Sequence, residues 1–247
     1  MKQNYIFDLY GTLVDIKTNE YKKTVWEKAA WYFSMRGANY TGTELRRRYH
    51  ELVTAEEKRL WKCLQKKYDG ITLREAEIQL DRVFAALYKE KGVRAGKGLI
   101  EDTMRSFRII TLEKLRLFDG AKELLQELKA AGKKVYLLSN AQTLFTAPEM
   151  QVLGITEYFD DIFFSSDLEV KKPSFHFYDA LFKKHGLKKE ESVMIGNDCF
   201  ADAGGAENYG IDSIYLHTEQ SPELTGELPE HCMRVQDLNE IRKGIMK

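Results

Sequence analysis

The sequence predicts an α/β protein with a doubly wound, parallel-sheet (Rossmann-like) core and a helical cap domain inserted after the first strand. Two observations predict this fold. Short apolar segments alternate with helical segments after residue 117, which is the pattern that right-handed crossovers give in a parallel sheet. A further apolar segment at residues 4–7 is separated from the others by a long helical stretch, residues 17–112.

The first strand is predicted at residues 4–7, where an apolar run ends at Asp8 and is followed by a loop. Residues 17–112 contain no proline and are rich in charged residues, alanine, leucine and aromatic residues. Apolar side chains recur there at helical spacing, for example at positions 80, 83, 84 and 87, and glycines interrupt the pattern. We expect about four helices packed on one another in this stretch.

After residue 117 the apolar segments become short and regularly spaced. Buried strands are predicted at residues 135–140, 162–165, 192–198 and 214–216. The helices between them are predicted at residues 121–131, 175–185 and 201–209. We therefore assign residues 1–15 and 116–247 to the α/β core, and residues 16–115 to the cap domain.

The charge balance and the cysteine count indicate which partners and which cellular compartment to expect. The chain has 38 Lys and Arg residues against 38 Asp and Glu residues, so its net charge gives no reason to expect nucleic acid or an anionic membrane as a partner. The three cysteines, Cys63, Cys199 and Cys232, are too few and too widely spaced for a disulfide framework or a zinc site. Asp8 interrupts the N-terminal apolar run, which excludes a signal peptide or anchor there. We expect a cytoplasmic protein.

Polar side chains follow the predicted strands at the points where they end. In an open parallel sheet, ligands bind beyond the carboxyl ends of the strands. The residues so placed are Asp8, Thr12, Ser139, Asn140, Lys172, Asp198 and Asp202. Taken singly, each also has a structural explanation as a turn, loop contact or helix cap. Their occurrence in order, at the end of one strand after another, favours a shared site.

These side chains suit one type of reaction. A carboxylate attacks an electrophilic centre and forms an ester or acyl-phosphate, which water later opens. Transfer from a phosphate ester also requires that the negative oxygens be neutralised. A lysine, hydroxyl and amide donors, and a magnesium ion held by carboxylates and a backbone carbonyl supply that neutralisation.

The ordered motifs resemble those of the haloacid dehalogenase-like hydrolase superfamily, in the subfamily whose helical cap follows the first motif. The resemblance covers nearly the whole chain. The matching segments are F-D-L-Y-G-T-L at 7–13, L-L-S-N at 137–140, K-P at 172–173 and I-G-N-D-x-x-x-D at 195–202. The resemblance implies that Asp8 is the nucleophile, that Ser139 binds a substrate oxygen, and that Lys172 neutralises charge. From their places after the strands, we also expect substrate contacts from Thr12 and Asn140.

Two departures from the family pattern affect the expected chemistry. Phosphatases of this family usually carry an aspartate two residues after the nucleophile, as general acid and base, and this chain has Tyr10 there. D-x-Y-G-T-L is also similar to the motif of the metal-free 2-haloacid dehalogenases, which lack the acidic pair of the fourth motif. In this chain the fourth motif has Gly196-Asn197 where G-D is usual, so Asp198 is the first choice of metal ligand. Asp202 is either a second metal ligand or a partner that orients Lys172 without binding the metal.

We therefore expect a magnesium-dependent phosphatase that acts on a small phosphorylated metabolite through an aspartyl-phosphate intermediate. The predicted Mg²⁺ ligands are Asp8, the backbone carbonyl of Tyr10, Asp198 and Asp202, and Tyr10 is also a candidate catalytic residue. The alternatives are a metal-free 2-haloacid dehalogenase and a degenerate member that binds a ligand or partner without turnover. The arginines considered for binding a substrate anion are Arg36, Arg46, Arg47, Arg48 and Arg116. The sequence leaves the substrate and the oligomeric state open.

Overall fold

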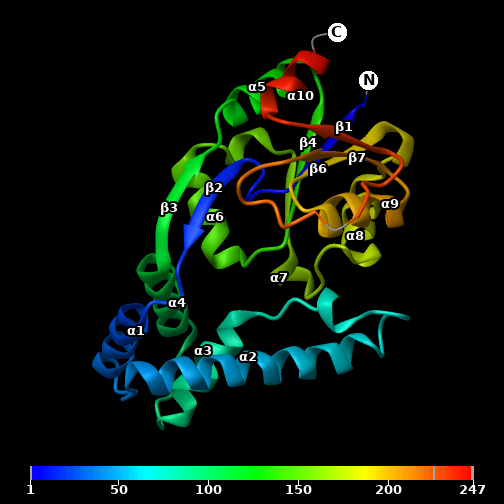
Figure 1. Cartoon of the computed structure of the whole chain (residues 1–247). Coiled ribbons are helices and arrows are strands. Elements are labelled where there is room, and N and C mark those ends of the chain that lie inside the picture. The colour runs from blue at the N-terminus through cyan, green and yellow to red at the C-terminus, as the bar shows by residue number, and fades with distance from the viewer. Residues whose placement is uncertain (1, 225, 246–247) are drawn as a thin grey trace.

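Six parallel strands form the central sheet, in the order β5-β4-β1-β6-β7-β8 (Figure 1). The strands are β1 (Asn4–Phe7), β4 (Lys134–Ser139), β5 (Asp161–Phe164), β6 (Ser192–Gly196), β7 (Asp212–Leu216) and β8 (Cys232–Val235). The computed structural model describes residues 2–224 and 226–245. Every neighbouring pair in this sheet is parallel, with Phe7 aligned to Leu137 on one side and to Ile195 on the other. The predicted fold class is confirmed.

Helices cover both faces of the sheet because successive strand residues point to opposite sides. Tyr5 and Phe7 belong to one apolar cluster, whereas Ile6 belongs to the other. The first face packs on α5 (Ala121–Ala130), α6 (Thr143–Leu153) and α10 (Leu238–Ile245). The second packs on α8 (Phe175–His185) and α9 (Gly205–Tyr209). The core is therefore a three-layer sandwich with β1 near the centre of its sheet.

The long stretch after β1 forms a separate group of helices, drawn below the sheet in Figure 1. They are α1 (Lys23–Met35), α2 (Gly42–Leu64), α3 (Leu80–Glu90) and α4 (Lys97–Thr111), with a short 3₁₀ turn η1 (Leu73–Glu75). Buried aromatic rings hold them together: the ring of Trp26 on α1 lies 5.3 Å from the rings of Tyr49 on α2 and Phe107 on α4. No helix among the described residues is long and apolar enough to cross a membrane.

A two-stranded antiparallel ribbon, β2 (Val14–Thr18) with β3 (Leu112–Leu117), connects the helical group to the sheet. The predicted division of the chain at residues 15 and 115 falls inside this ribbon. The buried carboxylate of Asp15 pairs with Lys114 at 2.9 Å and with Arg116 at 2.8 Å, which ties the two strands together. The ribbon was not predicted, because pairing between segments so far apart leaves no local pattern in the sequence.

A second contact joins the helical group to the core. Ala76 and Val170 form an antiparallel bridge, flanked by hydrogen bonds from Glu77 N to Glu169 O (3.0 Å) and from Lys171 N to Glu75 O (2.8 Å). This pattern of bonds makes Ala76 and Val170 a non-hydrogen-bonded pair. The Cα atoms of such pairs are about 4.5 Å apart. The helical group is thus held against the core at the ribbon and at this bridge.

We predict that the helical group moves as a lid, with β2 and β3 as its connections to the core. In the double variant Ala76→Cys/Val170→Cys, we expect a disulfide on oxidation, because the pair geometry is within disulfide range. The disulfide should lower steady-state turnover more than about tenfold, and a reductant should restore it. The two single-cysteine variants are the controls. Full turnover by the oxidised double variant would show that this contact need not open.

Candidate active site

Asp8 lies at the carboxyl end of β1, in the middle of the edge of the sheet where ligands bind. The backbone N–H of Asp8 donates to Ile195 O at 2.9 Å, which continues the β1–β6 pairing through this residue. The carboxylate is almost fully buried: Oδ1 lies 2.7 Å from Lys172 Nζ, and Oδ2 accepts from Thr12 Oγ1 at 3.2 Å. The predicted nucleophile is therefore held in place by a cation and a hydroxyl group.

Lys172 joins Asp8 to a second buried carboxylate, that of Asp202. Lys172 Nζ is 2.7 Å from Asp202 Oδ1 as well as 2.7 Å from Asp8 Oδ1. Burial raises the pKa of Asp202 above its ordinary range; Lys172 opposes this rise and Asp8 adds to it. Burial also disfavours the charge on Lys172, yet the two carboxylates outweigh it and raise the pKa of the lysine. The lysine accordingly stays cationic between the two acids.

Asn140 holds the backbone of Lys172 with both ends of its amide. Its Oδ1 accepts from Lys172 N at 2.8 Å, and its Nδ2 donates to Lys172 O at 3.1 Å. Ser139, one residue earlier, has a buried hydroxyl that makes no hydrogen bond within the described structure. Buried hydroxyl groups normally have a hydrogen-bond partner. The Ser139 hydroxyl is therefore available to bind the substrate oxygen that the sequence predicts for it. Substrate contact by Asn140 stays a prediction.

The loop after β6 directs the side chains of Asn197 and Asp198 to different partners, and metal binding by Asp198 stays a prediction. Asp198 Oδ1 accepts from the backbone N–H groups of Phe200 (2.8 Å) and Ala201 (2.9 Å), so this carboxylate caps the following helical turn. Asn197 instead faces the nucleophile loop, with Oδ1 3.2 Å from Thr12 Oγ1. Sequence reasoning did not select Asn197, although its position in the altered G-D pair was the available signal.

Glycine is required where the nucleophile loop meets this asparagine. Gly11 has a φ of 81°, in the left-handed region. A Cβ there would come within 2.3 Å of Asn197 Nδ2. The G of D-L-Y-G-T is thus explained by both backbone conformation and close approach.

The phenol of Tyr10 is directed into a buried polar cluster. Tyr10 OH donates to Glu149 Oε2 at 2.5 Å, and the phenol oxygen lies 3.0 Å from Thr146 Oγ1; both partners are on α6. Arg108 of α4 donates from Nε to Glu149 Oε1 at 2.6 Å, and its Nη2 is 3.4 Å from the phenol oxygen. Burial, and then the charge of Glu149, raise the pKa of Tyr10 well above its ordinary value. The phenol therefore stays protonated, and Glu149 and Arg108 are site residues that the sequence did not reveal.

A cavity of about 520 Å³ lies between the core and the helical group, beside this cluster. Tyr10 and Asn140 line it from the core, and Tyr49, Glu77 and Arg108 line it from the helical group. None of the five arginines considered from the sequence is among its lining residues. The position of the cavity beside Tyr10 and Asn140 makes it the candidate substrate pocket.

Known proteins resemble this chain in sequence and in fold. A family model described as haloacid dehalogenase-like hydrolase matches residues 3–210. A glyceraldehyde 3-phosphate phosphatase of Methanothermobacter thermautotrophicus is 30% identical over 139 residues, which are 56% of this chain and 62% of that protein. The pyrimidine 5'-nucleotidase PynA of Streptococcus pneumoniae is 27% identical over 183 residues, 70% of this chain and 73% of that one. The L-2-haloacid dehalogenase of Xanthobacter autotrophicus superposes with a TM-score of 0.57 at 18% identity, over 100% of this chain and 99% of that one.

We predict that Asp8→Asn lowers turnover more than about a thousandfold, because an amide cannot serve as the attacking carboxylate. Asp202 remains to pair with Lys172 in this variant, so the fold should persist. Circular dichroism checks the fold, and Asp102→Asn, an exposed aspartate of α4, is the matched control. Activity of Asp8→Asn within a few-fold of the wild type would exclude Asp8 as the nucleophile.

Proposed function

The chain belongs to the haloacid dehalogenase-like hydrolases, and on that premise we propose that it is a phosphatase acting on a small phosphorylated metabolite. The placement of Asp8 is the observation that carries this proposal. Its carboxylate lies at the sheet edge with Lys172 Nζ at 2.7 Å and the unpaired Ser139 hydroxyl on the neighbouring strand. A nucleophile, a cation and a free donor at one edge are what phosphoryl transfer requires.

In the proposed reaction, an Asp8 oxygen attacks phosphorus and the ester oxygen leaves, which forms an acyl-phosphate on Asp8. Lys172 reduces the repulsion between the carboxylate and the phosphate oxygens, and Ser139 donates a hydrogen bond to one of those oxygens. Asn140 keeps Lys172 in place through the two hydrogen bonds to its backbone. Water then attacks the acyl-phosphate, which releases phosphate and restores the carboxylate. The cavity beside Tyr10 holds the leaving group.

Phosphatases of this family generally use Mg²⁺, and the donors near Asp8 suit that ion. Among the described residues no three His, Cys, Asp or Glu side chains are grouped as a metal site. Magnesium, however, needs only one or two carboxylates and takes carbonyl oxygens and waters for the rest. The Asp8 carboxylate, the Tyr10 backbone carbonyl and Asn197 Oδ1 would hold it, with Asp198 and Asp202 as further candidates. Bound there, the ion would neutralise phosphate charge.

A metal-free 2-haloacid dehalogenase is the second candidate, and Tyr10 is the observation that favours it. The phenol stands where a phosphatase of this family usually has an acid, and it is committed to Glu149 and Thr146. The glyceraldehyde 3-phosphate phosphatase and the pyrimidine 5'-nucleotidase described above are 30% and 27% identical to this chain over their aligned residues, whereas the dehalogenase is 18% identical and resembles it in fold. The phosphatase is therefore the first choice. A member without turnover is disfavoured, because a buried set of three charges is costly to keep without a use.

One assay separates these candidates. Phosphate release is measured over a panel of phosphorylated metabolites with and without Mg²⁺, alongside chloride release from 2-chloropropionate. The phosphatase proposal predicts Mg²⁺-dependent phosphate release and no chloride. Metal-independent chloride release would establish the dehalogenase.

We predict that Asn197→Ala weakens Mg²⁺ binding more than Asp198→Ala does. Asn197 Oδ1 lies 3.2 Å from Thr12 Oγ1, which is itself 3.2 Å from Asp8 Oδ2, whereas Asp198 Oδ1 caps a helical turn. Calorimetric Mg²⁺ titration of both variants measures the difference, with Asp202→Ala for comparison. Greater loss in Asp198→Ala would return the assignment to Asp198, the first choice from the sequence.

We predict that aryl and acyl phosphates are hydrolysed at least about tenfold faster than alkyl phosphates. Alkyl leaving groups need a proton as they depart. The ordinary pKa of a tyrosine is about 10, and that of Tyr10 is raised well above it. Tyr10 is therefore a weak acid, and because it stays protonated it is also a poor base. Tyr10→Asp should raise the rate on alkyl phosphates, whereas Tyr10→Phe, the matched control, should not. Fast wild-type hydrolysis of an alkyl phosphate would show that another group supplies the proton.

A further inference from the structure

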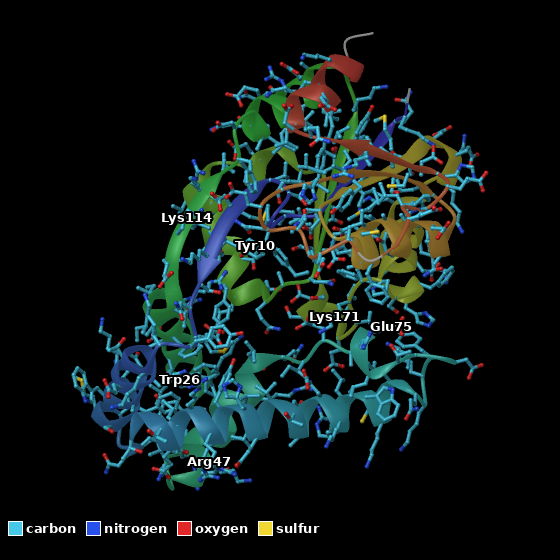
Figure 2. The ribbon with its side chains drawn as sticks, viewed as in Figure 1. Tyr10, Trp26, Arg47, Glu75, Lys114 and Lys171 are labelled. Carbon is cyan, nitrogen blue, oxygen red and sulfur yellow. The ribbon has the colours of Figure 1, made fainter. Side chains whose placement is uncertain are left out.

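Residues 75–80 of the helical group, here called the strap, lie against the loop that leads into Lys172. The bridge between Ala76 and Val170 and its two backbone hydrogen bonds attach the strap to residues 169–171. Figure 2 shows Glu75 and Lys171 close together where the helical group meets the core. Lys171 is bonded to the strap through its backbone N–H, and the next residue is the buried lysine of the site.

The side chain of Glu77 extends this attachment to two more core loops. Its Oε2 accepts from Ser165 Oγ at 3.1 Å, just after β5. Its Oε1 accepts from Gln142 Nε2 at 3.0 Å, in the loop after β4. Gln142 in turn donates to Ile78 O at 2.8 Å and accepts from Leu80 N at 3.1 Å. One carboxylate of the helical group therefore connects the ends of two neighbouring strands.

The placement of Lys172 depends on its backbone being held from two sides. Asn140 bonds the Lys172 peptide from the loop after β4, the same loop that carries Gln142. The strap holds the preceding residue, Lys171. Shifts of about 1 Å in a charged group at a reacting centre are enough to lower rates about a hundredfold. The contacts that fix residues 171 and 172 therefore bear directly on the chemistry.

We propose that Glu77 is a positioning residue, which couples the closed position of the helical group to the placement of Lys172 beside Asp8. The proposal rests on the phosphatase function proposed above. When the strap is seated, Glu77 bonds the loops after β4 and β5, and the Ala76–Val170 bridge fixes the approach to Lys172. When the strap leaves, all of these contacts are lost together, so the site is complete only in the closed form.

The environment of Glu77 agrees with this role. Burial raises the pKa of Glu77, while Lys171 and the bonds from Ser165 and Gln142 oppose the rise. Lys171 Nζ lies 3.8 Å from Glu77 Oε2. A carboxylate taken out of water in this way is stabilised only while its partners stay in place.

The test compares Glu77→Ala and Glu77→Gln with Glu75→Gln. Glu75 is the matched control, because its carboxylate accepts hydrogen bonds from Thr72 of the helical group and from no described residue of the core. Its backbone O keeps the bond to Lys171 N in the variant. The kcat and KM for p-nitrophenyl phosphate with Mg²⁺ are measured for each variant. Hydrogen exchange of the peptide covering residues 169–172 reports the strap contact without requiring activity.

For Glu77→Ala we expect kcat to fall more than tenfold with KM within about twofold of the wild type, and exchange at residues 169–172 to be faster. For Glu77→Gln we expect kcat to fall only about threefold, since the amide oxygen still accepts a hydrogen bond. Glu75→Gln should match the wild type in both measurements.

Unchanged kcat and unchanged exchange in a folded Glu77→Ala variant would overturn the proposal. A rise in KM alone would also overturn it, because Glu77 lines the cavity and would then be a substrate contact. Wild-type protein that releases no phosphate from any ester would instead overturn the proposed function, and with it the role given to Glu77. Even then, faster exchange at residues 169–172 in Glu77→Ala would show that Glu77 stabilises the contact between the strap and the core.

Discussion

Lys172 places a positive charge in the interior of the core, 2.7 Å from one carboxylate on β1's carboxyl end and 2.7 Å from another after β6. Taking charges out of water costs several kcal/mol for each ion, so such a set survives only when every partner is held in place. Removing one partner of a buried pair typically destabilises a protein by about 3–5 kcal/mol. The order of the strands, the Asn140 bonds and the strap contact all serve to hold this one lysine between Asp8 and Asp202.

That constraint explains which features the sequence predicts well. Buried strands that end at Phe7, just before Asp8, and at Ser139 and Gly196 have clear local signatures, and a parallel sheet necessarily brings such ends to one edge. The order of the motifs along the chain therefore predicts most of the site. The fold class and the strands at residues 4–7, 135–140, 162–165, 192–198 and 214–216 follow from the same signatures.

Most of the features that were missed depend on contacts between distant segments, and one, helix α6, was missed for a local reason. The β2–β3 ribbon pairs Val14 with Leu117, and no sequence pattern around either residue predicts that pairing. Helix α6 escapes prediction because Pro148 lies within it and its apolar residues show little helical periodicity. The bonds of Glu149 to Arg108 and Tyr10 join three elements, so only the folded chain reveals them. The choice between Asn197 and Asp198 turns on the path of a single loop, which periodicity cannot specify.

The proposed reaction passes through a phosphorylated Asp8, and detection of that intermediate is its decisive test. Wild-type protein is mixed with acetyl phosphate and Mg²⁺, quenched in acid within the first turnover, and digested for mass spectrometry. We predict phosphate on Asp8 in the peptide that contains residues 7–13, and no label in Asp8→Asn. Phosphate on a different residue would contradict it, and so would an unlabelled Asp8 that is instead esterified by 2-chloropropionate without metal.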